Sequence, residues 1–170
     1  MATLILIITA TLTALIAGLF YSYSCSVNPG LGKLSDREYI NAMNAINIAI
    51  LNPVFFLSFM GTLVLLPLST FLNYAPGHNT RFILLFIAAI IYAIGVFGVT
   101  IFGNVPLNNT LARVNTATAS SDELSTYRLM FEGPWVFLHT IRTLANVVSL
   151  ILVIVSCCIE SKQPGFSVQL

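Results

Sequence analysis

Charged side chains are scarce in this sequence. They make up 8% of the 170 residues, whereas hydrophobic residues make up 57%. A soluble domain usually carries about 25% charged residues, and a chain of this length has too small an interior to hide so much apolar surface. The net charge is only +1, which excludes the strongly basic surface with which proteins bind nucleic acids. The composition therefore predicts an integral membrane protein whose main partner is the lipid bilayer.

Cysteine is also scarce, and its spacing excludes several kinds of site. The three cysteines are Cys25, Cys157 and Cys158, and their spacing matches no metal-binding motif. Phosphate-binding loops, dinucleotide fingerprints and haem-binding motifs are likewise absent from the sequence. The predicted spans place Cys25 at the opposite membrane face from the other two, which excludes a disulfide between them. The Cys157-Cys158 pair is either an acylation site or the small apolar end of a helix.

Four long apolar runs dominate the chain. They cover residues 3–27, 52–73, 81–103 and 134–158, and each is long enough to cross a bilayer as a helix. The first run lacks the basic start and the cleavage pattern of a signal peptide, so we interpret it as a retained span. Short connections between four spans favour an all-α integral membrane four-helix bundle of up-down-up-down topology. Residues 1–170 are therefore expected to form a single, multi-pass transmembrane domain.

Local signals predict where some of these helices begin and end. Pro29 and the glycine after it are expected to end the first helix. Ser35 and Glu38 have the spacing of a capping box, which predicts the start of another helix. The asparagines of that segment share one side of it, so it is an amphipathic lead-in to the second span. Pro53 is expected to kink this helix rather than stop it.

One polar stripe interrupts the fourth span. Trp135, His139, Arg142 and Asn146 follow one another at spacings of four, three and four. On a helix, these four residues share an arc of about 60°. A cation within a membrane is costly and normally faces a bundle interior or a wet cavity. The stripe is therefore the strongest functional signal in the sequence.

Arg142 needs a partner that the spans themselves do not supply, because every acidic residue lies outside the four runs. Its partner is a loop carboxylate, Asp36 or Glu38 above all, or a set of asparagines and backbone carbonyls, or an anionic ligand. A buried cation without any partner would be too costly to keep. The residues alone leave these three alternatives open.

Other polar residues gather at the ends of the spans that we expect to share one membrane side. Helices that bring such ends together form a pocket that is open at one face and closed by apolar packing below. We therefore predict that a substrate contacts the following residues: Tyr21, Asn44, Asn47, Asn52, Asn104, Asn108, Trp135 and Asn146. The alternative is that they are helix ends in the headgroup region, where such residues are common.

His139 and Arg142 are the predicted catalytic residues. An imidazole titrates near neutral pH and suits general-base catalysis, while a guanidinium can stabilise an oxyanion. His139 beside an arginine is equally consistent with a hydrogen-bonding residue that has no part in chemistry. No serine or cysteine nucleophile has the sequence context that nucleophilic catalysis requires.

Four short motifs, in the same order along nearly the whole chain, resemble those of the anthrone oxygenase-like membrane proteins, formerly a family of unknown function. They lie at Gly18–Leu31, at Ala42–Asn47 with Asn52-Pro53, at Asn104–Asn108, and at Trp135 with Arg142-Thr143. The resemblance implies a protein with four spans. It also implies an oxidoreductase activity, because some fungal members of that family oxidise polyketide anthrones to anthraquinones with dioxygen and without metal or flavin. Most members have no assigned activity.

Three functions are consistent with these observations. The first is a monooxygenase without cofactor, which uses dioxygen as co-substrate and acts on anthrone-like hydroxylated aromatics. The second is a non-enzymatic protein that binds or transports a small lipophilic molecule. The third is a scaffold whose polar stripe only holds helices together. In the first reading, His139 removes the proton beside a carbonyl and Arg142 stabilises the resulting oxyanion.

Overall fold

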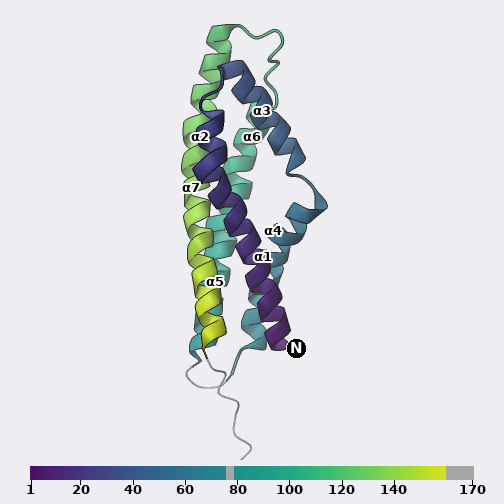
Figure 1. The fold of residues 1–170 in the computed structure, drawn as a ribbon, viewed down its shortest axis with the longest axis vertical. Helices are drawn as coiled ribbons and strands as arrows, with labels where there is room; N and C mark the ends of the chain where they lie inside the picture. Colours follow the sequence, from purple (N-terminus) through teal and green to yellow (C-terminus); the bar gives the residue numbers. More distant parts are fainter. Residues whose placement is uncertain (76–78, 160–170) are drawn as a thin grey trace, which may run out of the picture.

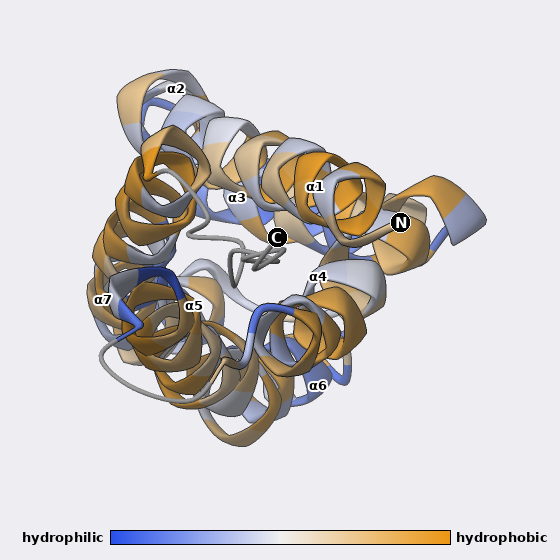
Figure 2. Ribbon diagram, turned by 90° about the horizontal axis from the view of Figure 1, so that it is seen from below, coloured by the Kyte–Doolittle hydropathy of each residue, from blue (hydrophilic) through white to orange (hydrophobic). Residues whose placement is uncertain are grey.

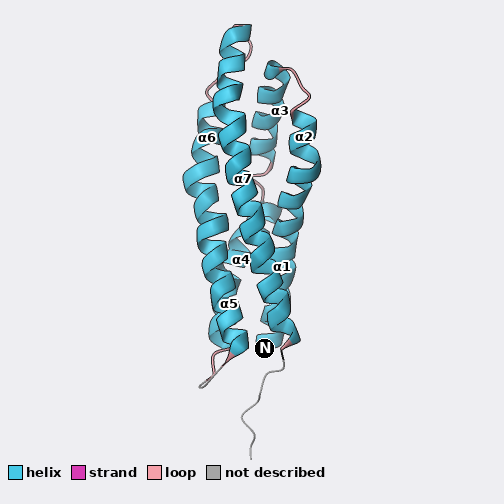
Figure 3. Ribbon diagram, turned by 90° about the vertical axis from the view of Figure 1, so that its left-hand side faces the viewer, coloured by secondary structure: helices cyan, strands magenta, loops and turns pink. Residues whose placement is uncertain are grey.

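The structure is a computed structural model that describes residues 1–75 and 79–159. Within these residues the protein is helical and contains no strand (Figure 3). Its elements are α1 (Ala2–Ser22), the π-helical segment η1 (Tyr23–Val27), α2 (Asn28–Leu31), α3 (Asp36–Ala49), α4 (Pro53–Leu72), α5 (Thr80–Ile91), the π-helical segments η2 (Tyr92–Gly98) and η3 (Thr100–Asn104), α6 (Val105–Leu111) and α7 (Ser121–Cys158).

In the described part of the chain, four helices are long and apolar enough to cross a membrane. They cover Ala2–Leu31, Pro53–Leu72, Thr80–Leu111 and Ser121–Cys158. The helices alternate in direction, and the start of α1 lies at the same end of the bundle as the end of α7 (Figure 1). The opposite end, which we call the loop end, carries the α2–α3 and α6–α7 connections. The predicted all-α, multi-pass membrane fold is confirmed.

The four spanning helices, which we call the first to fourth rods in chain order, form a ring. In this ring α1 packs against α4, α4 against α5, α5 against α7 and α7 against α1. Large apolar side chains cover the outside: Phe102 is 84% exposed, and Val54 and Phe71 are each 75% exposed. Hydrophobic residues accordingly make up most of the spanning helices in the view along the bundle axis (Figure 2). An outer surface of this kind is stable only where lipid replaces water.

The first helix continues through Pro29 to Leu31, so the prediction that Pro29 ends it is wrong. The π-helical segment η1 lies directly before this proline. A local π-helical adjustment re-satisfies the backbone groups that a proline frees, which is how membrane helices tolerate this residue. Similar segments in the third rod, η2 and η3, widen its turns. Every fourth residue from Tyr92 to Asn104 is consequently buried on one face.

The prediction that Pro53 only kinks the helix is wrong, because the helix stops before this proline. α3 ends at Ala49, and Asn52 has an extended backbone. The Asn52 side chain accepts hydrogen bonds of 3.0 Å from the backbone N–H groups of Val54 and Phe55 and so caps α4. A residue before proline avoids the helical region, and proline itself favours the first helical position. The chain therefore starts a new helix here, and the α3–α4 corner projects from the side of the bundle (Figure 1).

The predicted capping box at the start of α3 is confirmed, because Ser35 and Glu38 bond reciprocally. A second capping box, of Ser120 and Glu123, begins α7. That helix runs from the loop end through Pro134 to Cys158, so it is much longer than the predicted fourth span. Its length allows α7 to contact both α3 at the loop end and α5 along the spans.

Candidate functional site: a cavity beneath the loop end

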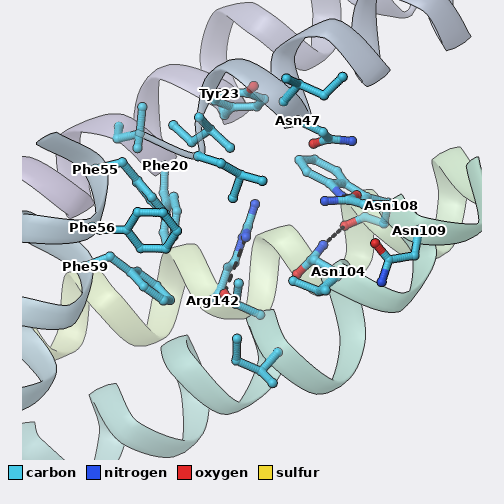
Figure 4. Close-up of a pocket in the computed structure, with 18 of the residues that line it drawn as sticks. Phe20, Tyr23, Asn47, Phe55, Phe56, Phe59, Asn104, Asn108, Asn109 and Arg142 are labelled. Carbon is cyan, nitrogen blue, oxygen red and sulfur yellow. Dashed lines mark hydrogen bonds between the residues drawn. The ribbon is translucent and has the colours of Figure 1, made fainter. Parts of the chain in front are cut away.

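A cavity of about 370 Å³ lies inside the bundle next to the α3–α4 corner. Its size falls within the range of about 300–1,000 Å³ that is usual for small-molecule sites. One wall is aromatic, with Phe20 from α1 and Phe55, Phe56 and Phe59 from α4. The opposite wall carries amides, and Arg142 of α7 projects between the two (Figure 4). The amide side chains that line the cavity are Asn44, Asn47, Asn104, Asn108 and Asn109.

The mouth of the cavity is identified by which lining residues are exposed. Ile48 and Leu51 at the α3–α4 corner are 73% and 65% exposed, and Phe56 and Ile101 are 43% and 38% exposed. The lining residues from α7, Trp135 and Arg142, are buried. The cavity therefore opens sideways between the corner and the third rod, and apolar side chains form much of its rim.

The guanidinium of Arg142 is held by neutral groups. Its Nε and Nη2 atoms donate to His139 Nδ1 at 3.2 and 3.1 Å, and Nη1 donates to Thr100 Oγ1 at 3.4 Å. Its central carbon also lies 4.5 Å from the ring centroid of Phe20 and 5.2 Å from that of Trp135. Aromatic faces attract cations, and more strongly where water is excluded. Three of the five guanidinium N–H groups are thus engaged.

None of the described residues supplies Arg142 with a carboxylate. Asp36 pairs with Arg128 at 3.0 Å, and Glu38 is engaged in the capping box of α3. The two salt bridges of the described chain both belong to Arg128. Of the three alternatives for the partner of Arg142, pairing with Asp36 or Glu38 is therefore the one that the structure contradicts. Its remaining N–H groups and its positive charge are available to whatever enters the cavity.

His139 lies behind Arg142 and does not line the cavity. It is 1% exposed and stacks on Trp135, with ring centroids 5.1 Å apart. A guanidinium has only N–H donors, so His139 Nδ1 must be the acceptor in that contact. His139 Nε2 lies 3.2 Å from the carbonyl oxygen of Phe20, which only accepts, so Nε2 carries the proton. Both ring nitrogens are engaged by protein groups. In this geometry His139 positions the Arg142 guanidinium; that it also acts as a base stays a prediction.

The amide wall is oriented by backbone and side-chain contacts. Asn104 Nδ2 donates to the Trp135 carbonyl at 3.2 Å, and Asn44 Nδ2 donates to the Leu111 carbonyl at 3.4 Å. Asn108 Oδ1 accepts from Trp135 Nε1 at 2.8 Å. Three buried amide atoms of this wall have no protein partner: Asn44 Oδ1, Asn47 Nδ2 and Asn104 Oδ1. Such atoms are costly to bury unless something else satisfies them.

Five of the eight residues predicted to contact a substrate line the cavity: Asn44, Asn47, Asn104, Asn108 and Trp135. Tyr21 does not; its side chain is 64% exposed on the outside of α1. Asn52 caps α4 instead of facing the cavity. Asn146 is fully buried below the cavity and does not line it. Arg142, one of the two predicted catalytic residues, lines the cavity.

The sequence analysis missed the aromatic wall and Tyr23. The inward face of α1 contains Ile16 and Phe20. Tyr23, one turn after Phe20, continues this face, whereas Tyr21 lies about 100° away from Phe20. A register taken from the buried apolar residues of the span would have identified Tyr23. The phenylalanines of α4 have no comparable signal, since lipid-facing and cavity-facing aromatics look alike in an apolar run.

A comparison with protein families identifies the family to which this chain belongs. The profile of the family described as anthrone oxygenase matches residues 55–152, more than half of the chain. The chain belongs to the anthrone oxygenase family. The matched region contains Phe59, Asn104, Trp135 and Arg142, so it includes both walls of the cavity and the cation between them. The comparisons find no match among curated proteins or among solved structures.

The described residues that line the cavity form no cluster of metal ligands. Among residues 1–75 and 79–159, no three His, Cys, Asp or Glu side chains come together as metal binding requires. The chemistry that the cavity does offer is a fixed positive charge, amide donors and acceptors, and aromatic faces. That the protein works without a cofactor stays a prediction.

Proposed function

We propose that this member of the anthrone oxygenase family binds a planar, hydroxylated aromatic ketone from the bilayer and oxidises it with dioxygen. The observation that carries the proposal is Arg142, a buried guanidinium without a carboxylate partner among the described residues, which projects into an aromatic-walled cavity. Buried cations require compensation, and an electron-rich oxygen of a ligand would provide it. The aromatic wall suits the flat apolar body of such a ligand.

The proposed reaction converts the ring methylene that lies across the central ring from the aromatic ketone, and is conjugated with it through the flanking rings, into a carbonyl. Loss of one proton from the methylene gives an enolate whose oxygen lies at Arg142, and the fixed guanidinium stabilises its negative charge. The electron-rich carbon reduces dioxygen and forms a carbon–oxygen bond, which gives a hydroperoxide once a proton is returned. Cleavage of its oxygen–oxygen bond, with loss of the second methylene hydrogen, releases water and leaves the carbonyl. One dioxygen is consumed, and its two atoms end in the product and in water.

Arg142 is the residue that this proposal places in contact with the reacting molecule. His139 acts through it, because His139 Nδ1 accepts the bonds that hold the guanidinium edge. The cavity presents no carboxylate and no free imidazole, so the first proton leaves to water at the exposed part of the rim, where Asn109 lies. The protein then contributes chiefly by stabilising the enolate rather than by abstracting the proton.

The test is aerobic conversion of a hydroxylated anthrone by membranes that contain the protein. We expect appearance of the quinone with uptake of one dioxygen and incorporation of one labelled oxygen atom from ¹⁸O₂. Arg142→Met should lower the rate by at least about a hundredfold, as loss of an oxyanion-stabilising donor does. The matched control is Arg113→Met, which removes an exposed cation at the loop end and should leave the rate unchanged. Undiminished conversion by Arg142→Met would refute the assigned role.

A second function, binding or transport of a lipophilic anion without turnover, is favoured by one observation. The described residues place no carboxylate and no free imidazole in the cavity, since His139 is covered by Arg142 and Trp135. Saturable binding of the same anthrone, without quinone formation above the level of membranes that lack the protein, would favour this function over the oxygenase.

A further inference from the structure

The oxygen atoms of Asn104 and Asn44 are unpartnered hydrogen-bond acceptors buried in the cavity wall. The orientation of each amide follows from its other contact. A backbone carbonyl only accepts, so the atom of Asn104 that faces the Trp135 carbonyl must be nitrogen, and its oxygen must point elsewhere. The same argument fixes Asn44 against the Leu111 carbonyl. Figure 4 shows the Asn104 oxygen on the side of its amide away from that bond.

We propose that Asn104 and Asn44 are specificity-determining residues that select ligands with free hydroxyl groups. An unpartnered acceptor in a buried wall requires a donor from the ligand, and a hydroxyl group provides one. An ether oxygen in the same place has no hydrogen to donate and adds a methyl group. The proposal rests on the proposed function in one respect, namely that the cavity binds an aromatic ketone.

Arg142 narrows the range of suitable ligands further, because it binds hydrogen-bond acceptors whereas Asn104 and Asn44 bind donors. It offers only donors, so it takes a carbonyl oxygen or an oxyanion, whereas Asn104 Oδ1 takes only a donor. Arg142 and Asn104 lie on neighbouring elements, α7 and η3, and both line the cavity. A ligand that satisfies both must carry an acceptor oxygen and a hydroxyl group on one polar edge. Its apolar edge then lies against the phenylalanine wall.

The size of the expected preference follows from the cost of an unsatisfied buried group, about 1–3 kcal/mol. Such a cost corresponds to roughly a tenfold to hundredfold weaker affinity for the methyl ether. Asn104 should contribute the larger part, because it is only 1% exposed and water cannot easily replace the ligand hydroxyl. Asn44 is only partly buried and should contribute less.

The experiment uses the full chain in lipid nanodiscs and two probes, a dihydroxyanthraquinone and its dimethyl ether. Both are already oxidised, so neither can turn over. Trp135 is the single tryptophan and lines the cavity, so quenching of its fluorescence reports binding directly. The wild type should prefer the dihydroxy probe by roughly tenfold to a hundredfold. Asn104→Leu should reduce that preference to about threefold or less, mainly by weakening the binding of the dihydroxy probe.

Two further variants complete the test. Asn44→Leu should reduce the preference partially, and it tests the proposal separately should Asn104→Leu fail to fold. Asn146→Leu is the matched control: Asn146 is also buried with unpartnered amide atoms but lies outside the cavity, so the preference should not change. Equal affinity of the wild type for both probes would overturn the hydroxyl selection and leave the binding function standing. An unchanged preference in both cavity variants would overturn the assigned residues. Binding of neither probe, together with no oxidation of an anthrone, would overturn the proposed function as well.

Discussion

The geometry of His139 gives a prediction that separates a positioning residue from a general base. His139→Asn should retain function, whereas His139→Leu should not. The Oδ1 atom of asparagine is reached through the same two bonds from Cβ as Nδ1 of histidine, so it can accept the bonds that Arg142 Nε and Nη2 now donate to His139. Leucine offers no acceptor, and both donors then lose their partner.

The magnitude follows from the bonds that are lost. A hydrogen bond to a charged group contributes about 1.5–3 kcal/mol. Without these bonds, about 2 kcal/mol of the free energy that holds the Arg142 guanidinium in place is lost. This loss corresponds to roughly thirtyfold weaker binding of an anionic ligand, because 1.4 kcal/mol is a factor of ten in affinity. We therefore expect the affinity to fall by about thirtyfold in His139→Leu and to stay within about threefold of wild type in His139→Asn. Loss of a general base, by contrast, lowers turnover by about 10²–10⁴ without requiring any loss of affinity.

The assay measures affinity and turnover on the same nanodisc sample. Quenching of Trp135 fluorescence by the dihydroxy probe gives the affinity, and aerobic oxidation of an anthrone gives the rate. A positioning role requires the affinity and the rate to fall together in His139→Leu and to recover together in His139→Asn. Should His139→Asn bind normally but lose turnover by a hundredfold or more, the reasoning is refuted and His139 is a base.

Two predictions concern stability, and thermal unfolding in detergent checks both. Arg128 donates hydrogen bonds to Asp36 and Glu132 and to the backbone carbonyls of Leu34 and Gly32. Arg128→Met should therefore lower the free energy of unfolding by about 2 kcal/mol. An effect below about 0.5 kcal/mol would mean that this network does not stabilise the loop end. A Cβ atom on Gly95 would lie 2.7 Å from the Ala145 Cβ, whereas one on Gly18 would meet nothing within 4 Å. Gly95→Ala should therefore cost about 1–3 kcal/mol and Gly18→Ala should cost nothing, and equal melting temperatures would contradict the close packing of η2 on α7.

Several local features were predictable because their causes are local. The capping box of Ser35 and Glu38 needs only two residues three apart, and it is present. The inward stripe of α7 needs only helical periodicity, and Trp135, His139 and Arg142 are all buried. The extension of the first helix through Pro29 was not predictable in this way, because it depends on the π-helical segment before it.

The cavity was predictable in part, for a related reason. Asparagines near the span ends indicated its amide wall, and most of them line it. Which atom of each amide faces the ligand depends on contacts between distant elements, such as Asn104 with the Trp135 carbonyl. Asn52 differs, because its side chain caps α4 locally at a position before Pro53, so it does not reach the cavity.

Composition and periodicity by themselves determined that this protein is a helical, multi-pass membrane protein with an arginine facing its interior, because the cost of exposing polar groups to lipid permits few alternatives. The tertiary structure alone decided what that arginine meets. The packing of the helices pairs Asp36 with Arg128, brings Thr100 to the Arg142 guanidinium, and places Phe59 and Asn104 on opposite sides of the same cavity. The residues of each pair are far apart in sequence, so their placement follows from how the helices pack rather than from any local pattern.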